Sequence, residues 1–232
     1  MSTAEAHKPR PRRLLDGVPP DTRVVIADVT WDVYESFVDA VREGENCHVA
    51  FDGKDIELMT VGPFHESLKS LVDTFVAIVA AELEIERQPL GQTTWMRKKV
   101  KRGVESDLCY YFDVAKLAAF AEAFVRGSNN VKDYPNSDLA IEVDVSPSKI
   151  DRPGIYAALR VPELWRVRKQ SVSIEQLGPS GTFVPAVASR FLHVQSHEVS
   201  RWLFGEDSRK RVTWERSLRE WVQDELGPRV NA

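Results

Sequence analysis

The stretch LAIEVDVSPSK, residues 139–149, has the apolar composition of a strand buried inside a protein, yet it carries two acids. Glu142 and Asp144 are two residues apart, and successive side chains of a strand point to opposite faces, so both carboxylates should project from one face. Like charges that close repel each other, and burying them is costly without a cation or hydrogen-bond donors. We therefore expect the pair to have a positively charged or hydrogen-bonding partner.

A second acidic pair, Glu105 and Asp107, has the same spacing at the head of the apolar run GVESDLCYYF. If the two strands are neighbours in a sheet, their carboxylates come within a few ångströms of one another. A hard divalent cation such as Mg²⁺ is the simplest partner for such a group, and it can stabilise charge on a phosphodiester. The alternative is that each pair lies on a solvent-facing strand.

The rest of the chain predicts helices and strands in mixed order. Asp52-Gly53 between two apolar runs is a strong hairpin signal. Apolar residues at helical spacing predict several helices: after Thr30, from Phe64 to about Glu84, within Val114–Val125, and twice near the C-terminus. Two strands are expected near Thr93–Arg97 and roughly Ser106–Phe112, with a turn at Gly103 between them. This order predicts an α/β fold with helices packed on a central sheet.

The length of 232 residues suits one sizeable domain with short extensions. We expect a disordered basic tail over residues 1–22, the main domain over 23–205 and a C-terminal amphipathic helix over 206–232. The start lacks the apolar core of a secretory signal, and no apolar run approaches the roughly 18 residues of a membrane span. Two cysteines without a paired motif agree with a reducing cytoplasm, and no membrane partner is expected.

The order of motifs resembles a known family over roughly Val29 to Phe204. The motifs are the Asp52-Gly53 hairpin, PFHE opening the long helix, GQTTWMRKK, GVESDLCYYF and DLAIEVDVSPSKIDRPGIYAALRVPELWRV. They are similar to the Uma-type family of bacterial proteins, a branch of the PD-(D/E)XK, or restriction-endonuclease-like, superfamily. The resemblance implies a restriction-endonuclease-like mixed central sheet flanked by helices. It also implies a metal-dependent endonuclease that hydrolyses phosphodiester bonds in DNA.

The resemblance also implies a set of site residues. Asp107 falls at the first aspartate of the superfamily, with Ser106 where proline is usual, and Glu142 falls at the acid of the second half-motif. Asp144 stands in place of the usual lysine, so Lys149 or Arg152 would supply the positive charge. The implied catalytic residues are Asp107, Glu142, Asp144, Lys149 and Arg152, and the implied ligands of Mg²⁺ (or Mn²⁺) are Asp107, Glu142, Glu105 and Glu66.

A basic run, RKKVKR, directly precedes the Glu105 and Asp107 pair. If the acids bind metal, this run lies beside the path of a nucleic-acid backbone, where it would contact phosphates. The predicted DNA-binding residues are Arg97, Lys98, Lys99, Lys101 and Arg102. The alternative is a solvated hairpin loop. The net charge of −4 argues only against a protein coated in positive charge, and leaves room for a local basic patch.

Three further alternatives stay open. Without the motif lysine and proline, the chain also fits a catalytically inactive nuclease-fold module that binds nucleic acid or a protein partner. His65 would either contact phosphate or metal, or be exposed at the start of the long helix. The closing helix, with Trp214, Leu218 and Trp221, would either form a homodimer contact or pack on its own domain.

Overall fold

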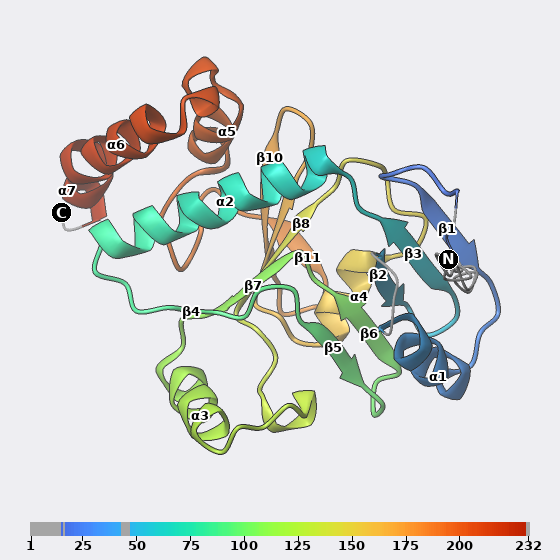
Figure 1. Ribbon diagram of the computed structural model, residues 1–232. Coiled ribbons are helices and arrows are strands. Elements are labelled where there is room, and N and C mark those ends of the chain that lie inside the picture. The colour runs from blue at the N-terminus through green and yellow to red at the C-terminus, as the bar shows by residue number, and fades with distance from the viewer. Residues whose placement is uncertain (1–14, 16, 43–46, 231–232) are drawn as a thin grey trace, which may run out of the picture.

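The computed structural model describes residues 15, 17–42 and 47–230, and its mixed α/β architecture confirms the predicted class (Figure 1). Most of the predicted N-terminal tail lies outside the described residues. The strands form two sheets, where we expected one. None of the described helices is long and apolar enough to cross a membrane.

The smaller sheet has five antiparallel strands. In spatial order they are β1 (Arg23–Ile26), β3 (Ile56–Thr60), β2 (Cys47–Phe51), β6 (Arg102–Glu105) and β5 (Thr94–Arg97). The predicted hairpin at Asp52-Gly53 joins β2 to β3. Helix α1 (Trp31–Arg42) packs beside this sheet, with Tyr34 stacked on Phe51 at a ring-centroid distance of 4.8 Å.

The larger sheet has six strands and is mixed, because β8 and β9 run parallel while its other pairs are antiparallel. In spatial order they are β11 (Phe183–Pro185), β10 (Val172–Leu177), β9 (Glu163–Val167), β8 (Leu139–Val143), β7 (Leu108–Tyr111) and β4 (Gln88–Pro89). The parallel pair is joined by the crossover helix α4 (Arg152–Ala158). The stretch LAIEV is therefore the central strand β8, buried at every position.

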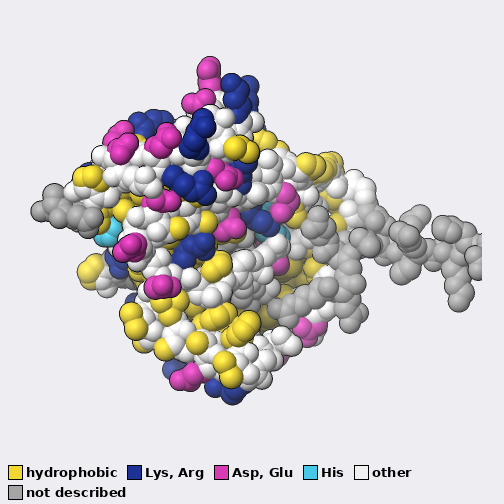
Figure 2. All heavy atoms as spheres, turned by 60° about the vertical axis from the view of Figure 1, so that its left-hand side comes forward, with side chains coloured by type: hydrophobic (Ala, Val, Ile, Leu, Met, Phe, Trp, Pro, Cys, Tyr) yellow, Lys and Arg dark blue, Asp and Glu magenta, His cyan; other side chains and the backbone are white. Residues whose placement is uncertain are grey.

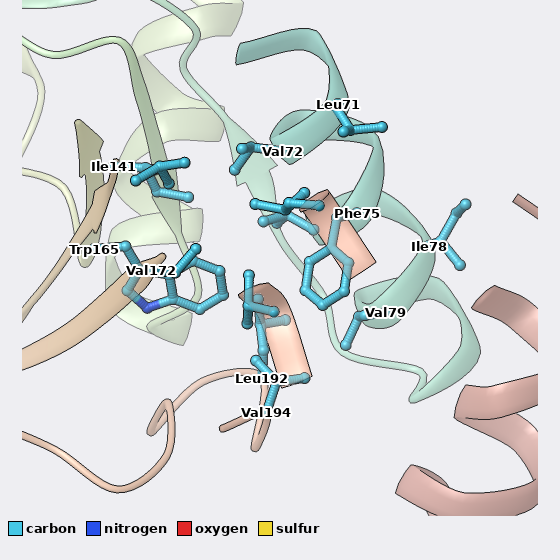
Figure 3. Close-up of a cluster of buried hydrophobic side chains, with 14 of the residues drawn as sticks. Leu71, Val72, Phe75, Ile78, Val79, Ile141, Trp165, Val172, Leu192 and Val194 are labelled. Carbon is cyan, nitrogen blue, oxygen red and sulfur yellow. The ribbon is translucent and has the colours of Figure 1, made fainter. Parts of the chain in front are cut away.

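The main core lies between the larger sheet and the long helix α2 (Pro63–Glu82), as Figure 3 shows. Phe75 on α2 points toward the side chains of Trp165 and Val172 on the sheet. The remaining elements are α3 (Val114–Val125), α5 (Ser196–Phe204), α6 (Arg211–Trp221), α7 (Gly227–Val230), η1 (Val131–Asp133), η2 (Glu206–Arg209) and η3 (Val222–Leu226).

The closing helices belong to the same core as α2. Trp214, Leu218 and Trp221 of α6 are buried in the cluster that contains Phe75. Of the two alternatives for this helix, the structure therefore has it packed on its own domain. Helix α3 is different, because it stands at the lower edge of the molecule, away from α2, α5 and α6 (Figure 1).

The strand expected over roughly Ser106–Phe112 is present as β7, but the expectation that Glu105 and Asp107 lie on one strand is wrong. Strand β6 ends at Glu105 in the smaller sheet, and β7 begins at Leu108 in the larger one. The predicted turn at Gly103 is also displaced, because the turn falls at residues 98–101 and Gly103 lies inside β6. A Cβ at Gly103 would overlap the ring of Tyr34, so this glycine serves a close contact between α1 and the sheet.

Candidate functional site

The switch between sheets places Asp107 where the two sheets meet. The register of β7 with β8 pairs Leu108 with Ile141, and continuing it puts Asp107 opposite Glu142. The backbone N–H of Val143 donates to Asp107 Oδ2 at 2.6 Å. The structure thus brings together the two acids that sequence reasoning placed at the centre of the site.

Glu142 is bound by residues of the helix that follows it. Arg152 Nη2 donates to both Glu142 oxygens, at 2.8 and 2.6 Å, and the Tyr156 hydroxyl donates to Oε1. Arg152 and Tyr156 are four residues apart on α4, so they project from the same face of the helix. Burial raises the pKa of Glu142, although the neighbouring Arg152 acts in the opposite direction.

A third buried acid, Glu57 of β3, was missed by sequence reasoning. It is fully buried and accepts hydrogen bonds from Arg23 Nη1 at 2.6 Å, the Ser148 hydroxyl at 3.0 Å and the Lys149 backbone N–H at 2.6 Å. Arg152 Nη1 lies 3.6 Å from Glu57 Oε1. The signal was available, because Glu57 is an acid within the apolar run IELM, as Glu142 is within LAIEV.

The partner expected for the Glu142 and Asp144 pair is supplied by arginines. Asp144 Oδ2 lies 3.0 Å from Arg166 Nε, and Asp144 Oδ1 lies 3.3 Å from Arg23 Nη2. Because Glu57 lies beside both Arg23 and Arg152, the acids and arginines form one continuous network, which is buried except at Arg166. We call this set the acid–arginine cluster: Glu57, Glu142, Asp144, Arg23, Arg152 and Arg166.

Asp107 is flanked by two buried histidines. Asp107 Oδ1 lies 2.8 Å from His48 Nδ1 and 3.2 Å from His65 Nε2, and His65 Nδ1 lies 3.4 Å from Glu66 Oε1. The two contacts to Asp107 Oδ1 lack hydrogen-bond geometry, so we treat them as close electrostatic contacts. His65 lies fully buried at the start of α2, so the alternative that it is exposed there is wrong.

These contacts shift the pKa values in opposite directions. Burial alone would raise the pKa of Asp107, but contact with His48 and His65 holds it far below 3.8. Burial alone would lower the pKa of His65, but Asp107 and then Glu66 outweigh this effect and raise the pKa above 6.5. Both shifts favour the charged pair in the folded state.

The side chains of Glu105, Glu66 and Lys149 take no part in the ion pairs of the acid–arginine cluster. Glu105 Oε1 accepts from Gln92 Nε2 at 2.8 Å and lines a cavity of about 670 Å³ that Asp107 does not line. Glu66 is 48% exposed and pairs with Lys69 at 3.0 Å. Lys149 Nζ donates to a backbone carbonyl of Arg23 at 2.9 Å. Lys149 and Arg152 were the two candidates to supply the positive charge in place of the motif lysine. Of these, Arg152 is the one whose side chain contacts Glu142.

Some side chains of the basic run RKKVKR are engaged in contacts within the protein, and others are exposed without an ion-pair partner among the described residues. The Arg97 guanidinium donates to the carbonyls of Val131 and Tyr134, and Arg102 donates to carbonyls within its own turn. Lys98 lies 3.6 Å from an Asp32 oxygen. Lys99 and Lys101 are exposed and have no ion-pair partner within residues 17–42 and 47–230. Two of the five predicted phosphate contacts are therefore unengaged.

The acids do not fit a divalent cation as they lie. Within the described ranges, no three His, Cys, Asp or Glu side chains are placed so that they could hold a metal ion. The oxygens of Glu142 accept from Arg152, and those of Asp107 face Val143 N–H and two imidazoles. Asp107 and Glu142 are 0% and 2% exposed. Arg152 supplies the positive charge that a metal ion would bring to Glu142.

A scan against protein-family models found no match for this chain, and a search of curated proteins found none either. The similarity to the Uma-type family therefore stays a prediction.

The shifted pKa values predict how stability depends on pH. A carboxyl group whose pKa is lowered on folding stabilises the protein above its ordinary value, about 3.8, and this contribution is lost as the pH falls. We expect the free energy of unfolding, measured with urea between pH 5 and pH 3, where His65 stays protonated, to decline by at most about 1.4 kcal/mol per pH unit from Asp107. The Asp107→Asn variant should be less stable at neutral pH, with a shallower decline. An unchanged slope in that variant would contradict the charged contact.

Proposed function

We propose that this chain is a restriction-endonuclease-like protein that binds DNA without cleaving it. The observation that supports this proposal is that the buried Arg152 guanidinium donates hydrogen bonds to both carboxylate oxygens of the buried Glu142. Breaking such a pair exposes an uncompensated charge to a low-dielectric interior and is strongly unfavourable. Glu142 is thereby unavailable to a metal ion, and a scissile phosphate has no open path to Asp107.

The β5–β6 hairpin is the proposed DNA contact. Its turn carries Lys99 and Lys101, which are exposed and unengaged, and Lys98, whose partner Asp32 is itself 84% exposed and therefore weakly held. Lysines at a projecting turn can approach phosphates without a groove. Such contacts position a protein on the duplex and carry no sequence information.

This proposal predicts salt-sensitive binding that depends on the hairpin turn. We expect the double variant Lys99→Glu/Lys101→Glu to bind a mixed-sequence duplex at least about tenfold more weakly, with the salt slope reduced by about two. Fluorescence anisotropy at several salt concentrations measures both quantities. The double variant Lys169→Glu/Lys210→Glu changes the net charge by the same amount at two exposed lysines outside the hairpin, so it is the matched control and should bind as the unchanged chain does. Equal weakening by the control would show a nonspecific effect of net charge.

The second candidate function is the metal-dependent endonuclease, and one specific observation favours it. Asp107 and Glu142 lie opposite each other, and Glu66 reaches Asp107 through His65, so three of the four predicted ligands are linked. This function requires Arg152 to release Glu142. Duplex cleavage in Mg²⁺ or Mn²⁺ that disappears in both Asp107→Ala and Glu142→Ala would establish it and overturn the non-cleaving proposal. The proposal expects DNA binding, no cleavage, and no thermal stabilisation of the unchanged chain by Mn²⁺.

A further inference from the structure

Helix α3 presents an apolar surface that the described residues of the chain leave exposed. Lys116 and Glu122 are the only residues of α3 that are not Ala, Val, Leu or Phe, yet of its twelve described residues Ala123 alone is buried. Val114, Phe124 and Val125 are 80%, 70% and 85% exposed. Figure 2 shows hydrophobic side chains gathered on the lower face of the molecule, the edge that α3 occupies in Figure 1. Contiguous apolar surface of this kind is typical of an interaction site.

The exposed residues of α3 form a regular seam. Val114, Ala118, Ala121 and Val125 are all exposed, and they follow one another at spacings of four, three and four residues. This is the spacing of the residues that face a partner helix in a coiled coil. The opposite face is turned to the domain, since Lys116 Nζ lies 2.5 Å from Asp138 Oδ1 and Ala123 is buried. The seam therefore points away from the other described residues of the chain.

We propose that this seam binds the same seam of a second copy of the chain, with the two α3 helices antiparallel. The spacing of four, three and four residues reads the same in both directions. An antiparallel copy therefore places Val114 opposite Val125 and Ala118 opposite Ala121 twice, as a two-fold interface requires. The small alanines at the centre let the helices approach closely, and the valines close both ends.

The charges at the helix ends favour the same arrangement. Asp113 precedes α3 as its N-cap, and Arg126 follows as its C-cap. In an antiparallel pair, Asp113 of one copy comes to the same end as Arg126 of the other, and the opposed helix dipoles also attract. In a parallel pair, like charges and like dipole ends would meet instead.

The size of the surface predicts a weak dimer. A helix of twelve residues is about 18 Å long, so the seam alone offers less than the roughly 800 Å² per partner of a standard interface. Phe124 and Phe120, stacked at a centroid distance of 5.7 Å, extend the apolar surface on one side of the seam. We expect a dissociation constant of about 1–100 µM, which is typical of interfaces at the small end of the range.

Analytical ultracentrifugation across that concentration range tests the dimer. The unchanged chain should shift from monomer to dimer, whereas Ala118→Glu and Ala121→Lys should each stay monomeric. Val212→Glu, at a valine of α6 that is 83% exposed, is the control and should dimerise normally. Circular dichroism confirms that each variant is folded. A monomer at all concentrations, or normal dimerisation of Ala118→Glu, would overturn the proposal.

Mixing the two variants tests the antiparallel register. In an antiparallel pair, Glu at position 118 of one chain faces Lys at position 121 of the other, so an equimolar mixture should form a heterodimer although neither variant forms a homodimer. A mixture that stays monomeric would overturn the antiparallel arrangement. Neither measurement involves DNA, so its result is independent of whether the proposed function is correct.

Discussion

Replacing Arg152 by methionine is expected to lower the free energy of unfolding by about 3–5 kcal/mol, the usual cost of breaking a buried ion pair. Arg152 is 3% exposed, and its loss leaves Glu142 without its cation and leaves Arg23 as the one cation beside Glu57 among the described residues. Methionine has a comparable length, so the change reports mainly on charge. Urea denaturation at neutral pH measures the effect.

Two control variants distinguish the effect of breaking the Arg152–Glu142 ion pair from the effect of shortening any arginine side chain. Arg160→Met changes an exposed arginine just beyond the end of α4 and should leave stability unchanged. The double variant Arg152→Met/Glu142→Leu should recover much of the lost stability, because an apolar pair can replace a buried ion pair. If Arg152→Met unfolds at the same urea concentration as the unchanged chain, the acid–arginine cluster is not arranged as described.

The same variant tests how the acids would respond to a metal ion. With Arg152 removed, Glu142 and Glu57 lose a shared cation, so Mn²⁺ should raise the melting temperature of Arg152→Met but not that of the unchanged chain. Equal stabilisation of both proteins would show that Arg152 does not compete with metal and would favour the endonuclease candidate.

Replacing Phe75 by alanine is expected to cost a similar amount, about 3–5 kcal/mol, for a different physical reason. Phe75 is fully buried at the centre of the core between α2 and the larger sheet (Figure 3), and its removal leaves a cavity. Because α2 also carries His65 to Asp107, a shift of the helix should weaken the pH dependence attributed to Asp107 as well. Urea denaturation at two pH values measures both effects.

Phe64 provides the matched control for this substitution. It is the second residue of the same helix and is 53% exposed. Phe64→Ala should therefore change the free energy of unfolding by no more than about 0.5 kcal/mol. A comparable loss in both variants would mean that the cost comes from helix propensity and not from the core.

Much of the local structure could be predicted because it depends on neighbouring residues. The helix over Val114–Val125 and the hairpin at Asp52-Gly53 follow from apolar spacing and turn chemistry. The sequence placed Asp107 and Glu142 together only on the condition that their strands are neighbours, and the pairing of β7 with β8 meets that condition. The switch of sheets at Ser106-Asp107 was not predictable, since nothing in a short apolar run shows which strands will pair with it.

The sequence by itself determined that buried acids would need positive partners, because an unpaired charge in an apolar strand is too costly to persist. Only the tertiary structure decided which cations serve. Arg23 is 121 residues from Asp144 and Glu57 is 95 residues from Arg152, and their meeting depends on how the two sheets are joined. Residue spacing encodes which face a side chain takes, whereas the identity of its partner is set by contacts between distant segments that no local pattern records.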